Sequence, residues 1–166
     1  NLESDDLKAK LNAIFSFVTQ AYTTLSNPEK RKEYDKRLST MPAQPVSNEQ
    51  LAEERFYEAT IEFNKGNLVQ ALNLFGQAAY LDSSVAKYHY YYGLALGKLN
   101  RLKEAVRAIE RALRIEPSNV NYLVDLGYIF RDLDLMTRAK STFEKALKLS
   151  PASKRAREGI EVIHGS

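Results

Sequence analysis

The segment AVRAIERALRIEP, residues 105–117, decides the fold, because similar segments occur at residues 71–83 (ALNLFGQAAYLDS) and 139–151 (AKSTFEKALKLSP). The offset is 34 residues each time. The shared columns are Ala71, Ala105 and Ala139; Phe75, Ile109 and Phe143; Ala78, Ala112 and Ala146; Leu81, Ile115 and Leu149; and, upstream, Ala59, Gly93 and Gly127. A constant period of this length indicates a stack of helical hairpins.

Each column has a physical role in such a hairpin. The small residues allow the two helices of a unit to approach closely, and the Phe75 column fills the space between hairpins. Pro117 and Pro151 end the second helix of their units, because proline has no backbone N–H and pushes the preceding residue out of the helical region.

This pattern resembles the tetratricopeptide repeat (TPR), over about residues 52–153. The resemblance implies an all-α fold, a three-repeat TPR superhelix with units at 52–85, 86–119 and 120–153. Near the start of each unit, TPRs usually carry a large residue at a fixed position. This chain departs from that pattern, with Arg55, His89 and Leu123 at the three equivalent positions. The first unit also lacks the small glycine and the final proline, as end units often do.

Both ends of the repeats carry capping signals. Ser47 followed by Gln50 predicts a capping box at the first repeat helix, so the repeats are assigned to residues 48–153. Residues 154–166 are predicted to form a capping helix and tail, with Ala156, Ile160 and Ile163 on the inner face. Lys154, Arg155 and Arg157 are expected to face water.

The N-terminal piece, residues 1–39, is predicted to be a helical hairpin. Apolar residues at helical spacing run through residues 2–25, Ser26-Asn27-Pro28 breaks that helix, and Pro28 starts a second one. Residues 40–47 are assigned to a linker because they hold two prolines.

The string AYTTLSNPEKRKEYD, residues 21–35, resembles the last two helices of a J-domain (DnaJ-like), the module with which co-chaperones engage Hsp70. J-domains stimulate Hsp70 through a His-Pro-Asp tripeptide, which this sequence lacks. Hsp70 stimulation is therefore not expected. Because the chain opens at Asn1 rather than Met, we expect a piece of a longer protein.

A hairpin of this size cannot bury enough surface to stand alone. Ile14, Phe17, Val18 and Tyr22 would be left without a mate. Exposed apolar patches recruit partners, so we expect the hairpin to pack on the repeats or to form a homo-dimer with a second copy.

Composition excludes several classes of function. The 166 residues hold no cysteine and only two histidines, His89 and His164, which excludes disulfides, thiolate sites and a histidine-based metal site. No glycine-rich phosphate loop or nucleophile elbow occurs, so we assign no catalytic residue, metal ligand or cofactor and expect no enzyme. No apolar run could span a membrane and no secretory signal is visible, so we predict a cytoplasmic protein without a membrane partner.

By the TPR resemblance, the first helix of each unit lines a concave groove. Six of its eighteen inward positions are aromatic, against 10% of the whole chain. The residues that we assign to the peptide-binding groove are Phe56, Tyr57, Thr60, Phe63, Asn64, Lys87, Tyr90, Tyr91, Leu94, Lys98, Asn121, Tyr128 and Arg131. Tyrosine offers area, stiffness and a hydroxyl together, so we predict that a protein or peptide ligand binds there.

Structural roles compete with this interpretation. Any one of these rings could instead pack between neighbouring first helices. Tyr92 falls where the repeat needs a packing residue, whereas Tyr90 and Tyr91 fall on the groove. His89 occupies the column of large packing residues and is predicted to be structural.

Some TPR proteins bind the acidic tails of Hsp70 and Hsp90 through a clamp of Lys, Asn and Arg side chains. The matching positions here are Phe56, Thr60, Tyr91, Asn121 and Asp125, and none of them matches. An Asp where a clamp cation belongs would repel a carboxylate, so no such clamp is expected.

Two alternative functions remain open. The chain could be a scaffold that self-assembles through the N-terminal helices or the groove. Lys103, Arg107, Arg111 and Arg114 form a basic stripe on the convex side, which would serve a nucleic-acid binder; glutamates dilute it, so nucleic acid is the less favoured partner. We predict a protein–protein interaction module from a co-chaperone-like or scaffold protein.

Overall fold

The computed structural model describes residues 2–40 and 46–164 of the chain. The chain divides into two compact units, Asn1–Pro45 and Val46–Ser166, which are described separately. No helix among the described residues is long and apolar enough to cross a membrane. Most of the predicted linker, residues 41–45, lies outside the described residues, as does the end of the predicted tail, 165–166.

The first unit is a pair of helices, α1 (Leu2–Leu25) and α2 (Pro28–Thr40). The break between them falls where the sequence predicts it. Asn27 caps α2, since its side-chain oxygen accepts hydrogen bonds from the backbone N–H groups of Glu29 (3.0 Å) and Lys30 (3.1 Å). α2 extends through Thr40, one residue into the predicted linker.

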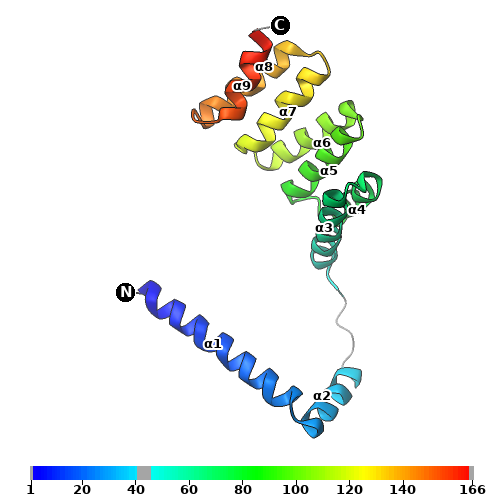
Figure 1. The fold of residues 1–166 in the computed structure, drawn as a ribbon, viewed down its shortest axis with the longest axis vertical. Coiled ribbons are helices and arrows are strands. Elements are labelled where there is room, and N and C mark those ends of the chain that lie inside the picture. The colour runs from blue at the N-terminus through cyan, green and yellow to red at the C-terminus, as the bar shows by residue number, and fades with distance from the viewer. Residues whose placement is uncertain (1, 41–45, 165–166) are drawn as a thin grey trace. The chain divides into compact units, whose positions relative to one another are not determined.

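The second unit consists of seven helices among the residues described. They are α3 (Asn48–Lys65), α4 (Leu68–Leu81), α5 (Ala86–Lys98), α6 (Leu102–Ile115), α7 (Val120–Asp132), α8 (Met136–Leu149) and α9 (Lys154–His164). Figure 1 shows them in order from teal to red, and each packs on the next. This arrangement confirms the predicted all-α repeat fold: α3–α4, α5–α6 and α7–α8 are the hairpins and α9 caps the last one.

The predicted capping box opens α3. The Ser47 side chain accepts from the Gln50 backbone N–H (3.2 Å), and the Gln50 side chain accepts from the Ser47 backbone N–H (3.1 Å). These two bonds satisfy groups that the first helical turn would otherwise leave unpaired. The sequence signal at this position therefore marks the start of α3.

Close helix contact explains the repeated small residues. Phe75, Ile109 and Phe143 are completely buried. A Cβ added at Gly93 would lie 2.6 Å from Ile109 Cγ1, and one added at Gly127 would lie 2.6 Å from Phe143 Cε1. The large core side chain of each of these units therefore occupies the space that its glycine leaves open.

Another set of equivalent residues, one from each unit, lies in the turn between the two helices of the hairpin. Gly66, Asn100 and Asp134 all have left-handed backbone conformations, with φ of 85°, 60° and 62°. Glycine adopts this conformation freely, and asparagine and aspartate tolerate it better than other residues do. The turn between the two helices is thus the same in all three units.

Candidate functional site

The predicted groove begins at an aromatic cluster between the first two hairpins. The Phe56 ring centroid lies 5.1 Å from that of Tyr88, 5.2 Å from Tyr91 and 5.6 Å from Phe75. Phe56 and Tyr91 are half-buried, whereas Phe75 and Tyr88 are buried. The cluster therefore joins α3, α4 and α5, and Phe56 and Tyr91 have a packing role in addition to any ligand contact.

Two lysines on α5 lie over rings of α3. Lys87 Nζ is 5.1 Å from the Phe56 ring centroid, and Lys98 Nζ is 5.5 Å from that of Phe63. Both side chains are exposed, and neither takes part in an ion pair among those of the described residues. At 1.5 Å per residue they stand roughly 16 Å apart on the same side of α5.

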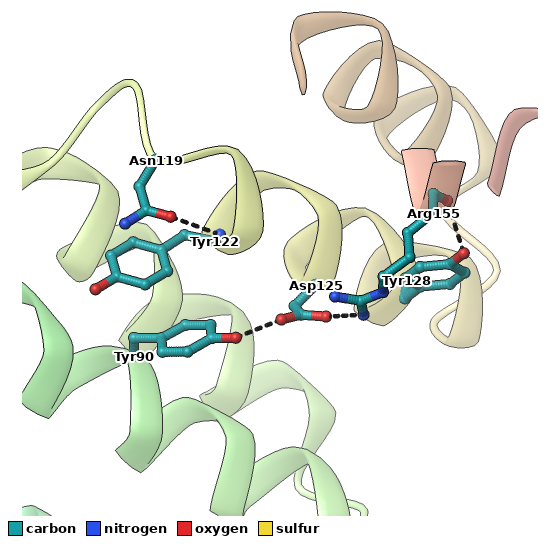
Figure 2. Close-up of polar contacts among 6 residues, drawn as sticks. All are labelled: Tyr90, Asn119, Tyr122, Asp125, Tyr128 and Arg155. Atoms are coloured by element: carbon teal, nitrogen blue, oxygen red, sulfur yellow. Dashed lines mark hydrogen bonds and ion pairs between the residues drawn. The ribbon is translucent and has the colours of Figure 1, made fainter. Parts of the chain in front are cut away.

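Tyr90 is held by a polar network that crosses three helices (Figure 2). Its hydroxyl donates a 2.5 Å hydrogen bond to Asp125 on α7, and Arg155 on α9 donates to the other oxygen of that carboxylate. The Tyr90 ring stacks on Tyr122, with the centroids 4.2 Å apart. Burial and the bond to Asp125 raise the pKa of Tyr90, and burial beside Glu116 raises that of Tyr122 to about 12. Both hydroxyls therefore stay protonated at neutral pH.

The capping helix completes the last hairpin. The Tyr128 hydroxyl donates to the backbone carbonyl of Arg155 at 2.8 Å (Figure 2). The guanidinium groups of Arg131 and Arg155 lie 5.0 Å and 5.6 Å from the Tyr128 ring centroid. Arg155 is exposed, as predicted, but the sequence did not show that its guanidinium also pairs with the mostly buried carboxylate of Asp125.

The thirteen predicted groove residues fall into two groups by exposure. Tyr57, Asn64, Lys87, Lys98 and Asn121 are exposed, whereas Phe56, Thr60, Phe63, Tyr90, Tyr91, Leu94, Tyr128 and Arg131 are partly buried. The hydroxyl of Thr60 donates to the Phe56 carbonyl at 2.9 Å, and Arg131 pairs with Asp132 at 2.7 Å. The first group is therefore accessible to solvent, and the second is partly covered by neighbouring side chains.

Hollows that the sequence did not predict lie elsewhere on the repeats. One of about 680 Å³ lies over α4, between Leu51, Val69, Tyr80 and Tyr92. Another of about 540 Å³ lies between α6, α7 and α8. Neither is lined by a predicted groove residue. A signal for the first was present, because α4 holds no charged residue, whereas α6 and α8 carry several each.

His89 has the structural role that was predicted for it. It is buried, and its Nε2 donates to the Ser83 carbonyl at 3.1 Å. Burial lowers its pKa, so the ring is neutral at pH 7. Tyr92, assigned to packing, is partly buried against Gly76. Within the described part of the chain, no group of three or more His, Asp and Glu could hold a metal ion.

Residues 86–119 and 120–153 each match the family described as tetratricopeptide repeat, and these are the hairpins α5–α6 and α7–α8. These two hairpins are tetratricopeptide repeats. The two matched ranges coincide with the second and third units that the sequence period predicts.

Solved TPR structures share the fold. The Arabidopsis OM64 TPR domain superimposes with a TM-score of 0.69 at 21% identity, covering 72% of this chain and 98% of that one. The first TPR of Spaghetti (RPAP3), bound to HSP90 peptide SRMEEVD, gives 0.69 at 17% identity, covering 74% and 97%. At these identities the likeness is one of fold alone.

Curated relatives are much longer than this chain. The probable UDP-N-acetylglucosamine–peptide N-acetylglucosaminyltransferase SPINDLY of Petunia hybrida is 23% identical over 129 residues, which are 78% of this chain and 14% of that protein. The chain spans from 8% to 41% of the length of the first three curated relatives that it matches.

Proposed function

We propose that the chain is a protein–protein interaction module that binds a peptide segment on the first-helix face of its TPR units. The observation that carries the proposal is the pairing of open side chains with fixed rings beneath them: Lys87 over Phe56, and Lys98 over Phe63. A surface held in place before binding loses little side-chain entropy when the ligand arrives.

The chemistry of the exposed groove residues favours an extended peptide that carries carboxylates. Tyr57 offers an exposed ring, and Lys87 and Lys98 offer two ammonium groups without an ion pair among the described residues. Asn121 adds an exposed amide on α7. An extended segment gains about 3.3 Å per residue, so carboxylates roughly five residues apart would reach both lysines. Binding is recognition without a covalent step.

The ligand need not be an Hsp70 or Hsp90 tail. Similar folds hold such peptides, as in the RPAP3 domain with SRMEEVD. The residues at the clamp positions here remain Phe56, Thr60, Tyr91, Asn121 and Asp125, without a cation. Asp125 is engaged by Tyr90 and Arg155, so its charge is partly offset, and the missing cations are the stronger reason to expect no clamp.

We also propose that the module belongs to a co-chaperone-like or scaffold protein of the cytoplasm. The J-domain-like string at residues 21–35 supports this origin. The transferase activity in the name of the SPINDLY relative is not carried over, since this chain corresponds to 14% of that protein.

The test is a peptide selection on the whole chain, followed by titration calorimetry of the selected peptides. Tyr57→Ala/Lys87→Ala/Lys98→Ala should weaken binding by about 100-fold, because it removes an exposed ring and both cations. Lys103→Ala/Arg107→Ala, which removes two exposed cations from α6, is the matched control. Equal loss in both variants, or none in the first, would contradict the proposal. Peptide SRMEEVD should bind neither protein tightly.

A further inference from the structure

Positive charge collects on the second helices of the last two TPR units. α6 and α8 together hold eight lysines and arginines against three glutamates, a net charge of +5, whereas the whole chain has a net charge of +3. The equivalent helix of the first hairpin, α4, holds no charged residue. The repeat fold therefore does not require charge at this place, and a local excess of one sign is typical of a surface that attracts a partner of the other.

Half of these cations form one row along α6, at intervals of 4, 4 and 3 residues. They are Lys103, Arg107, Arg111 and Arg114. Side chains at this spacing lie on one side of a helix, and the row extends over roughly 16 Å. All four are exposed, and none takes part in an ion pair among those of the described residues. The row is therefore available to the carboxylates of a ligand.

The hollow of about 540 Å³ between α6, α7 and α8 lies beside this row. Glu110 and Leu113, the sequence neighbours of Arg111 and Arg114, both line it. Its other apolar lining residues are Pro117, Leu123, Leu126 and Phe130. A ligand whose charges meet the row can therefore place an apolar side chain in the hollow.

The glutamates of α6 already have cation partners. Arg138 of α8 donates to Glu110 at 2.9 Å, and its guanidinium lies 4.1 Å from the centroid of the Phe130 ring. This pair links the two sides of the hollow. Glu104 pairs with Arg101 at 2.7 Å. The repulsion that these two carboxylates would exert on an acidic ligand is therefore partly offset.

We propose that the exposed sides of α6 and α8, with the hollow between them, bind an acidic amphipathic helix of another protein. The carboxylates of that helix lie on the cation row of α6, and one of its apolar side chains enters the hollow. This surface is separate from the groove of the first helices, so the proposal does not rest on the proposed function.

The spacing of the row favours a helical ligand over an extended one. Carboxylates at intervals of 3 or 4 residues on a helix repeat about every 4.5–6 Å, so they can match the row over its whole length. An extended chain presents the same side at every second residue, about every 6.6 Å. It would be out of step by roughly 3 Å at the fourth cation.

Nucleic acid fits this surface less well than a protein does. Proteins that bind single strands combine cations with aromatic side chains on which the bases stack. α6 has no aromatic residue, and the single aromatic residue of α8, Phe143, is completely buried. The apolar lining of the hollow also offers nothing to a phosphate.

Fluorescence anisotropy of the whole chain with a labelled model helix tests the proposal. The probe is an alanine-based peptide of about 20 residues, with four glutamates spaced to match the row and one leucine on the adjoining side. Arg111→Gln/Arg114→Gln should weaken its binding by about 10-fold, because each exposed ion pair contributes modestly. No binding by the parent chain, or no loss in this variant, would overturn the proposal.

The matched control is Lys87→Gln/Lys98→Gln, which removes two exposed cations from α5. This variant should bind the probe as tightly as the parent chain does. An equal or greater loss in the control would place the probe in the groove, which would overturn this inference and leave the proposed function standing. Far-UV circular dichroism checks that both variants keep their helicity.

A double-mutant cycle tests the hollow. Ser141 lines the hollow and is exposed, so Ser141→Tyr should fill the hollow without disturbing the core. Replacement of the probe's leucine by alanine should weaken binding to the parent chain by about 10-fold and leave binding to Ser141→Tyr unchanged. An equal effect of the leucine on both chains would contradict its place in the hollow.

Two competing ligands test the chemistry of the partner. A probe with a central proline cannot remain helical and should bind at least about 10-fold more weakly. A single-stranded oligonucleotide should not displace the original probe at equal concentration. Equal binding of the proline probe would show an extended ligand, and tighter binding of the oligonucleotide would show a phosphate site; either result would overturn the proposal.

Discussion

The hydroxyl of Tyr90 on α5 donates a 2.5 Å hydrogen bond to the carboxylate of Asp125 on α7, 35 residues further along the chain. Arg155 reaches the same carboxylate from α9. One acidic group thus links two TPR units and the capping helix (Figure 2). The Asp125 side chain is only 13% exposed, so its partners matter more than they would at the surface.

Removal of this carboxylate should destabilise the repeats. Asp125→Ala leaves the Tyr90 hydroxyl without its acceptor and Arg155 without its partner, which should lower the free energy of unfolding by about 1–3 kcal/mol. Asp132→Ala is the control, because Asp132 is exposed and pairs with its neighbour Arg131; it should cost less than about 0.5 kcal/mol. Urea unfolding followed by circular dichroism measures both, and equal losses would show that the network adds nothing.

Glycines that touch the core should respond differently from glycines that do not. Gly127→Ala places a Cβ 2.6 Å from Phe143 Cε1, whereas Gly97→Ala places one 3.9 Å from Ile129 Cδ1. We expect Gly127→Ala to lower the free energy of unfolding by about 1–3 kcal/mol through overpacking. Gly97→Ala should raise it by about 0.5 kcal/mol, since alanine favours helix. Thermal melts of the two variants would contradict this account if they shift in the same direction.

The fold could be predicted from the sequence because the packing contacts that produce it repeat from one unit to the next. Ala105, Ile109 and Ala112 recur with the period of the structural unit, so a contact in one hairpin is a contact in the next. The column Gly66, Asn100 and Asp134 has the same period and could have been found, because these three residue types tolerate the left-handed conformation.

The candidate site was only partly predictable, because its contacts are not periodic. The sequence placed Tyr90 and Tyr91 on one face, but it could not show that Tyr90 bonds to Asp125. Arg155 comes from the capping helix, which packs on α7 and α8 and has no counterpart in the repeats. The hollow over α4 lies on the second helix of its unit, outside the first-helix face that the repeat pattern predicts as the groove.

The left-handed turn residues Gly66, Asn100 and Asp134 allow a test of backbone strain. Asn100 has a φ of 60°, where a Cβ costs about 1–2 kcal/mol for most residues. Asn100→Ala should therefore destabilise the repeats by about 1 kcal/mol, and Asn100→Gly should be neutral or stabilising. Gly66→Ala should behave like Asn100→Ala, because nothing lies within 4 Å of its added Cβ and the backbone alone is strained. Chemical denaturation that ranks alanine above glycine at residue 100 would refute the argument.

His89 should make the repeats less stable as the pH falls. Burial lowers the pKa of His89 in the folded chain below its value of about 6.5 in the unfolded chain. Between the two pKa values the unfolded state binds a proton that the folded state does not, so the free energy of unfolding falls as the pH is lowered through about 6.5 and levels off below the folded pKa.

His89→Leu removes this difference and copies the residue at the equivalent position of the next unit, where Leu123 is buried. Its unfolding free energy should vary less between pH 7.5 and about 5.5 than that of the parent chain, a range that lies above the ordinary pKa values of Asp and Glu. Urea titrations at each pH measure the two slopes. Identical slopes would mean that His89 is protonated as readily in the folded chain as in the unfolded one, and that its bond to Ser83 offsets the cost of burial.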